Sequence, residues 1–266
     1  MRSLSSVEKK EEGEQPPEWP DMVKEVTTIP AKAGMNRFAW DLRYEPPAKI
    51  PNSFYASSGP IGPLVLPGKY EVRLTANGKT LTQQLEVRLD PRISVSTAEL
   101  QKEFDLAWKV HESNNQLHIA VNQIRDMHAE LARLKKRFGN EAKLQPVMLA
   151  AKTLDGKMDD IEQGLIQVNM KGSEANLAFP NQLNEKFDSF IRSVESADGE
   201  PTKQQYDVYQ FFNGQLQKLL ADWRQVQTND VQTFNAMVEK YQVPFLAPEG
   251  MPGSSSAAGG AEKEPR

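Results

Sequence analysis

One long helical pattern dominates the chain. Residues 96–138 read STAELQKEFDLAWKVHESNNQLHIAVNQIRDMHAELARLKKRF, and no proline occurs before Gly139. Ser96 and Glu99 have the spacing of a capping box, in which each side chain accepts from the other residue's backbone N–H. The pattern predicts a helix over 97–138, roughly 63 Å long at the α-helical rise. Its buried stripe, with steps of mostly three or four residues, consists of Leu100, Phe104, Ala107, His111, Asn114, His118, Val121, Ile124, His128, Leu131 and Phe138.

Three further helices are predicted after this one. Apolar residues at helical spacing indicate helices over 141–168 and 182–196. A last long helix begins at Thr202, which has Gln205 three residues later in a second capping box. Laid end to end, the two middle helices match the first and last in length.

The helix lengths suggest an architecture for residues 93–245. Gly139 and the stretch 199–201, Gly-Glu-Pro, are short connections that force the chain to reverse. We therefore expect an antiparallel helical bundle of three rods, in which the middle rod is broken.

Residues 22–92 show the period of strands. Apolar and polar side chains alternate over 37–43 and again over 69–75. Asn77-Gly78 follows the second run, and 81–89 is again extended, which predicts a hairpin. We interpret 22–92 as an immunoglobulin-like β-sandwich, so the predicted fold is an α+β multidomain protein with a sandwich followed by the bundle.

Both ends of the chain have the composition of unstructured segments. Residues 1–21 are charged and proline-rich, and 246–266 are rich in Gly, Ser and Ala, so we expect a disordered linker and a disordered tail. No run approaches the ~20 apolar residues of a membrane span, and no signal-peptide hydrophobic region follows Met1.

The composition argues against several function classes. A formal net charge of -4 is not that of a nucleic-acid binder, which carries a strong basic face. The absence of cysteine excludes disulfides and thiolate metal sites. The sequence contains no nucleophile motif and no phosphate-binding loop, so we expect no catalytic residues and no cofactor.

The three histidines do not have the spacing of a metal site. His111, His118 and His128 share one predicted helix, but no two of them are four residues apart, as a zinc-protease helix requires. Carboxylates such as those of Asp159, Asp160 and Glu162 fit a solvated helix surface. We therefore expect no metal ligands among these residues.

The strand motifs resemble a known family. Residues 34–44 read GMNRFAWDLRY, Gly62-Pro63 follows, 67–74 read PGKYEVRL, 78–80 read GKT and 90–92 read DPR. The first and third motifs resemble the Ig-like module of flagellar hook-capping proteins. Together with the long helices, the whole order is similar to the C-terminal region of bacterial BNR/Asp-box-repeat proteins, which are labelled glycosyl hydrolases or sortilin-like proteins.

This resemblance implies a non-catalytic structural and interaction module of a secreted protein. In that family a pair of β-propellers precedes the region and would hold any hydrolytic site, whereas this sequence contains no Asp box. The implied partner is a β-propeller, in cis or from another chain, and the implied location is periplasmic or extracellular. Candidate interface residues are Trp40, Tyr70 and Phe211, the last being an exception to the buried stripe of its helix.

Two other functions stay open at this point. One alternative is that the chain is the remnant or a subunit of a sialidase-like hydrolase. In that case residues such as Arg37, Asp41 or Arg43 would contribute to a composite active site. A third hypothesis is a free-standing helical adaptor that binds a partner along the Phe211 side of the bundle.

Overall fold

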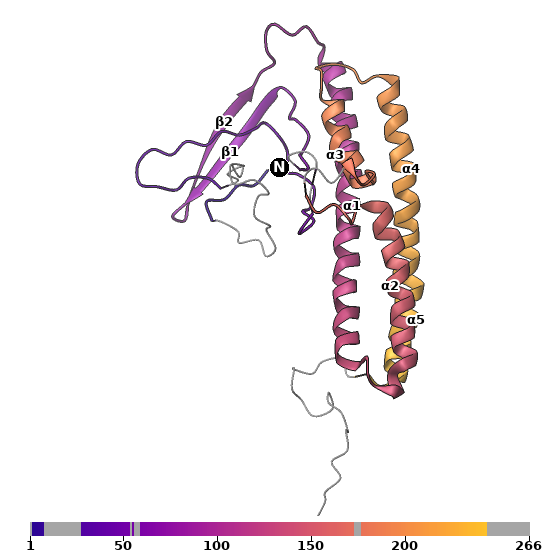
Figure 1. Cartoon of the computed structure of the whole chain (residues 1–266). Coiled ribbons are helices and arrows are strands. Elements are labelled where there is room, and N and C mark those ends of the chain that lie inside the picture. Colours follow the sequence, from indigo (N-terminus) through magenta and orange to yellow (C-terminus); the bar gives the residue numbers. More distant parts are fainter. Residues whose placement is uncertain (1, 8–27, 54, 56–58, 173–176, 244–266) are drawn as a thin grey trace, which may run out of the picture. The chain divides into compact units, whose positions relative to one another are not determined.

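The computed structural model describes residues 2–7, 28–53, 55, 59–172 and 177–243 (Figure 1). Most of the predicted linker, 8–21, and the predicted tail, 246–266, lie outside these residues. A 3-10 turn, Ala142–Leu144, and a π-helical turn, Val226–Asp230, accompany the helices. The strands and α-helices, in chain order, are β1 (Gly68–Ala76), β2 (Lys79–Val87), α1 (Thr97–Phe138), α2 (Gln145–Leu165), α3 (Leu183–Val194), α4 (Lys203–Gln225) and α5 (Val231–Lys240).

The chain forms two compact units, which we describe separately. The first comprises Met1–Gln123 and Ile161–Ala221, and the second comprises Ile124–Asp160 and Asp222–Arg266. The hairpin of β1 and β2 and the helix α3 belong to the first unit, and α5 belongs to the second. The helices α1, α2 and α4 contribute residues to both.

The predicted Ig-like β-sandwich over 22–92 is wrong. The described residues are mostly helical and contain one sheet, which has two antiparallel strands. A sandwich requires two packed sheets. The fold is therefore not a sandwich followed by a bundle.

The run 37–43 alternates in sequence but forms no strand. Leu42 has a φ of 59°, in the left-handed region, which interrupts an extended chain. Among the described residues its pairing is limited to one bridge, between Arg43 and Leu64, with Val65 N–H donating to Leu42 C=O at 2.8 Å. Alternation marks two faces but does not supply the neighbouring strands that a sheet needs.

The predicted hairpin is confirmed. The two strands pair in antiparallel register over nine residue pairs, and the last of these places Ala76 opposite Lys79. Asn77 and Gly78 form the turn with φ values of 49° and 74°. Positive φ at both positions is what a two-residue type I′ turn requires, and its twist matches that of the strands.

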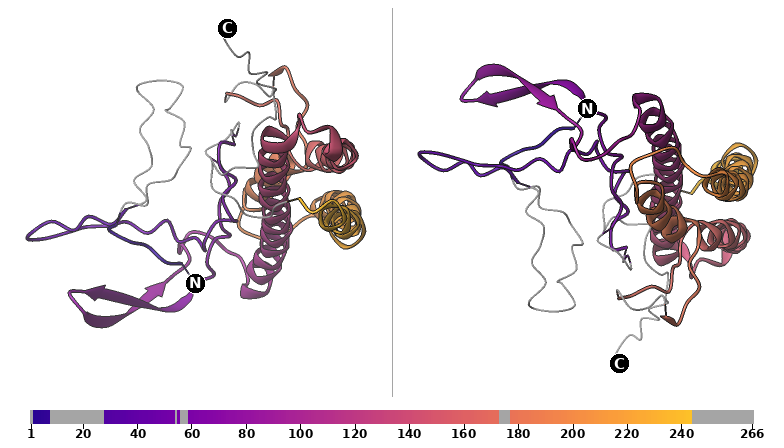
Figure 2. Two further views of the ribbon diagram at one scale, coloured as in Figure 1. Left: turned by 90° about the horizontal axis from the view of Figure 1, so that it is seen from below. Right: turned by 90° about the horizontal axis from the view of Figure 1, so that it is seen from above.

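Residues 28–45 form an irregular loop that lies beside the hairpin in both views of Figure 2. Residues 2–7 contact this loop. Ile29 N–H donates to Ser5 C=O at 3.0 Å, and Ser3 N–H donates to the Glu45 carboxylate at 3.1 Å. The first part of the predicted linker is thus hydrogen-bonded to the loop.

Both predicted capping boxes are present. Ser96 N–H donates to Glu99 Oε2 at 2.8 Å, and Glu99 N–H donates to Ser96 Oγ at 3.2 Å. Thr202 and Gln205 exchange the same two bonds, at 2.8 and 3.3 Å. These bonds satisfy backbone donors that a helix leaves exposed, and α1 covers the predicted range 97–138.

The other helices differ from the predictions mainly at their ends. The helices α2 and α3 are shorter than the predicted 141–168 and 182–196. The last predicted helix is confirmed from its start, but the π-helical turn separates it into α4 and α5. Such a turn inserts about one extra residue into a helix without breaking it.

In the first unit, α1 packs against α3 and α4. Phe187 of α3 is fully buried, and its ring meets that of Phe212 of α4 edge to face, with centroids 5.9 Å apart. The Ser113 hydroxyl of α1 donates to Asn213 Oδ1 of α4 at 3.2 Å. The buried side chains of α1 in this unit include Leu106, Ala107, Val110, Leu117, Ala120 and Val121.

In the second unit, an apolar cluster joins the end of α1, the start of α2 and α5. Its buried members are Phe138, Leu144, Val147, Val238 and Val243. Lys157 of α2 pairs with Asp230 at 2.6 Å, at the half-exposed edge of the unit. Exposed pairs of this kind contribute about 0–1 kcal/mol, so apolar packing dominates the stability of this unit.

Replacing Phe187 by alanine tests the packing of the first unit. Loss of a fully buried phenylalanine should lower the free energy of unfolding by about 3–5 kcal/mol. Phe211→Ala serves as the control, because that ring is 63% exposed and its loss should cost less than about 1 kcal/mol. Urea unfolding measures both; equal losses in the two variants would contradict this packing.

Candidate functional site

The hairpin has one apolar face and one polar face. Residues opposite each other in an antiparallel pair lie on the same face, and every second residue along a strand joins them. Applied to the register, this rule places Lys69, Glu71, Arg73 and Thr75 on one face with Thr80, Thr82, Gln84 and Glu86. The opposite face carries Tyr70, Val72, Leu74, Leu81, Gln83, Leu85 and Val87, with Gly68, Ala76 and Lys79 at its ends. We call the first seven of these residues the hairpin face.

Much of the hairpin face is exposed. Leu74 and Leu81 lie opposite each other and are 54% and 70% exposed, while Val72 is 48% exposed and Leu85 37%. A run of large apolar side chains on one sheet face is the usual mark of a surface that another element covers. The hairpin face is therefore the candidate site of this chain.

Trp40 and Tyr70 lie together at the start of the hairpin. Their ring centroids are 6.0 Å apart, in an edge-to-face arrangement. The Tyr70 hydroxyl donates to Leu66 C=O at 2.6 Å, and Trp40 Nε1 donates to Arg43 C=O at 3.0 Å. Burial, with a smaller effect of Tyr44, raises the pKa of Tyr70. The two predicted interface residues thus fix the loop 28–45 to the base of the hairpin.

Phe211 lies apart from this pair, on α4. Its ring is 63% exposed and contacts the ring of Phe212, with centroids 6.0 Å apart. Val208, one turn earlier, is 37% exposed. The predicted interface residues therefore form two surfaces, the hairpin face with Trp40 and a smaller patch on α4.

Two of the three candidate residues of a composite hydrolase site serve intramolecular contacts. Arg43 pairs with Glu195 at the end of α3, with 2.6 Å between the charged atoms, and donates to Gly62 C=O at 2.8 Å. Asp41 pairs with Arg2. Arg37 is exposed. These contacts hold the loop 28–45 in place, which is a structural role.

His111 and His118 lie in different surroundings within the first unit. The His118 ring is fully buried between Ala48 C=O, which Nδ1 contacts, and Asn184 Oδ1, which lies 2.7 Å from Nε2. Burial lowers the pKa of His118, and these two hydrogen bonds offset only part of the effect. His111 packs against the ring of Trp108, and burial lowers its pKa as well.

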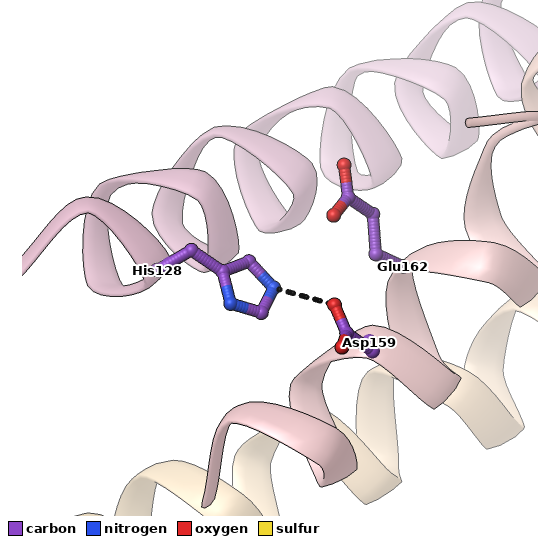
Figure 3. A group of neighbouring side chains, drawn as sticks. All are labelled: His128, Asp159 and Glu162. Carbon is purple, nitrogen blue, oxygen red and sulfur yellow. Dashed lines mark ion pairs between the residues drawn. The ribbon is translucent and has the colours of Figure 1, made fainter. Parts of the chain in front are cut away.

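His128, in the second unit, contacts two carboxylates of α2, and Figure 3 draws one of these contacts, the one with Asp159. Its Nδ1 is 2.6 Å from Asp155, and its Nε2 is 3.4 Å from Asp159. Figure 3 also draws Glu162, one turn further along the same helix. The two aspartates lie four residues apart, on one face of α2, and tie it to α1 through one imidazole.

No protein-family model, curated protein or solved structure matches the chain. The similarity to BNR/Asp-box-repeat proteins therefore stays a prediction that rests on the sequence motifs. No helix within the described residues is long and apolar enough to cross a membrane.

Sequence reasoning did not single out the most exposed residues of the site. Val72, Leu74, Leu81 and Leu85 have the pattern of a strand with one buried face. That pattern indicates which side chains share a face, but it cannot indicate whether the same chain covers that face. The sequence signal for an uncovered face is the scarcity of further strand patterns between residues 28 and 96.

Acidification should destabilise the chain through its buried histidines. The pKa values of His111 and His118 lie below the ordinary value of 6.5, so below that pH the unfolded chain binds protons that the folded chain does not. The free energy of unfolding, measured with urea, should be lower at pH 5.5 than at pH 7.5.

His118→Gln separates this effect from that of the carboxyl groups. The raised pKa of Glu103 acts in the opposite direction, because the folded chain then binds the extra proton. The loss of stability between pH 7.5 and 5.5 should be smaller in His118→Gln than in the native chain. Identical losses would show that His118 does not contribute.

Proposed function

We propose that the chain is a non-catalytic interaction module whose hairpin face docks on a β-propeller. The observation that carries the proposal is the opposed pair Leu74 and Leu81, which is more than half exposed on a two-stranded sheet. An isolated two-stranded hairpin is at best marginally stable in water. An element of this kind is completed by a further layer.

The geometry of the hairpin favours a β-rich partner. A flat sheet face packs well on another sheet, with side chains of the two layers interdigitating. The opposite face of the hairpin is polar, with residues such as Glu71 and Arg73, and suits contact with water. The sequence resemblance is a second reason to propose a β-propeller, because propellers precede this region in the exported BNR/Asp-box-repeat proteins.

A comparison of the free energy of burial with the free-energy cost of association favours a propeller in the same polypeptide. Full burial of a valine or leucine side chain contributes about 1.5–3 kcal/mol, and four such side chains are exposed on the hairpin face. Association of separate chains costs an estimated ~4–15 kcal/mol in lost freedom. The four side chains are 37–70% exposed, so only part of that contribution remains to be gained on docking, and it offsets no more than the lower end of the cost. A covalent connection reduces the cost.

A second candidate function is a helical adaptor. Phe211 and Val208, one turn apart on α4, form a smaller exposed apolar patch. Two side chains bury much less surface than the hairpin face does. The hydrolase alternative has no comparable observation, since Arg43 and Asp41 are held by Glu195 and Arg2.

The docking proposal is tested with a β-propeller encoded in the same reading frame as this chain or in an adjacent one. The separately purified propeller is titrated with the native chain by calorimetry, and then with Leu74→Gln/Leu81→Gln. The double variant should weaken binding on the order of 100-fold, because two leucines lose burial worth about 3 kcal/mol or more.

The matched control changes the other face of the same strands. Thr75→Gln/Thr82→Gln lies on the polar face of the hairpin and should leave the affinity unchanged. If Phe211→Ala abolishes binding and the leucine variant does not, the helical adaptor is the correct function. A genome that encodes no propeller in the same or an adjacent reading frame, or a propeller that does not bind this chain, would contradict the docking proposal.

A further inference from the structure

The first unit contains a pocket of about 250 Å³ beside the base of the hairpin. Its walls come from the ends of the hairpin, from the first turns of α1 and from the end of α3. Apolar side chains that line it include Leu42, Leu64, Val87, Leu89, Leu100 and Phe104. Four carboxylates, those of Asp90, Glu103, Glu195 and Asp198, line the same pocket together with the guanidinium of Arg88. Such a combination of apolar walls and a few charged groups is typical of a binding site.

Glu103 is the unusual group of this pocket. It is 8% exposed, and Gly199 N–H donates to its Oε2 at 2.9 Å. Within the described part of the chain, this is the single hydrogen bond that its carboxylate receives. Burial, and then the charges of Asp198 and Glu195, raise the pKa of Glu103. A buried carboxylate is costly unless a cation or several donors accompany it.

The charges around the pocket are matched except at two carboxylates. Glu195 pairs with Arg43, and Asp90 pairs with Arg92 at 2.6 Å. The lining Arg88 pairs with Glu86 at 2.5 Å. Among the described residues, no lysine or arginine forms an ion pair with Glu103 or Asp198. The pocket therefore carries an excess of negative charge beside an apolar wall.

The pocket is continuous with the hairpin face. Val87, which closes β2 opposite Gly68, belongs to the hairpin face and also lines the pocket. Leu66 and Pro67, directly before β1, line it as well. A partner seated on the hairpin face would thus extend over the mouth of the pocket.

We propose that the pocket takes a lysine or arginine side chain of the partner that covers the hairpin face. This inference rests on the docking proposal and names the chemistry of the contact. The methylene stem of a basic residue packs along apolar walls while its cationic end pairs with carboxylates. Glu103 and Asp198 supply the unmatched negative charge. A Ca²⁺ or Mg²⁺ ion fits less well, because such ions need six or more oxygen ligands.

The test uses n-butylammonium as the probe, since it has an apolar stem and a cationic end. It is titrated into the full chain, and the amide resonance of Gly199, whose N–H contacts Glu103, reports binding. We expect a saturable shift that n-butanol does not produce. The dissociation constant should rise about tenfold or more in Glu103→Gln, which loses a charge-assisted contact. Glu112→Gln, an exposed acidic position on α1, is the matched control and should bind as the native chain does.

Three results would overturn the inference. One is the absence of a saturable shift, and another is equal binding by native chain and Glu103→Gln. The third is a response to CaCl₂ without a response to n-butylammonium, which would make the pocket a metal site. Glu103→Gln should remain folded, because it removes a buried charge with little change in shape.

The experiments distinguish a failure of the pocket inference from a failure of the docking proposal. Leu74→Gln/Leu81→Gln leaves the pocket lining intact, so it should still bind n-butylammonium after it has lost the propeller. In the complex, Glu103→Gln should weaken the binding of the propeller by about tenfold, and n-butylammonium should compete with the propeller for the chain. Binding of n-butylammonium without either effect would mean that the pocket is a cation site unrelated to the partner.

Discussion

A two-stranded sheet cannot bury its own apolar face. In β1 and β2 the alternation of side chains sends Val72, Leu74, Leu81 and Leu85 to one side, and all four are more than a third exposed. Apolar surface of this kind is stabilised only when another layer removes it from water. The docking proposal supplies that layer from a partner, whereas the helices of the first unit bury their apolar stripes among themselves.

The helices hold the base of the hairpin in a defined place. Three residues on one face of α1, Asn115, His118 and Asn122, contact the backbone of Ala48 and Lys49. The ion pair between Arg43 and Glu195 connects the loop 28–45, which lies just before Ala48 and Lys49 in the chain, to the end of α3. These polar side chains connect the segment before the hairpin to α1 and α3.

The sequence predicted elements much better than their assembly. Helical spacing and the capping box of Ser96 predicted α1 correctly, and Asn77-Gly78 predicted the hairpin turn, because these signals act between near neighbours. The sandwich failed because alternation over 37–43 does not indicate whether strands exist to pair with it. The pocket at Glu103 was missed since its walls come from segments as far apart in the sequence as Leu42 and Asp198. The available signal was an acidic residue between Leu100 and Ala107 on the buried stripe of α1.

Hydrogen exchange of the chain without partner tests the central claim most directly. The account predicts that amides of β1 and β2 exchange by local opening, far faster than the amides of α1 between Leu106 and Val121, because the hairpin lacks a covering layer. Binding of the propeller should then slow exchange in the hairpin. If the hairpin amides are protected as strongly as those of α1 in the chain by itself, the hairpin does not depend on a partner and the claim is contradicted.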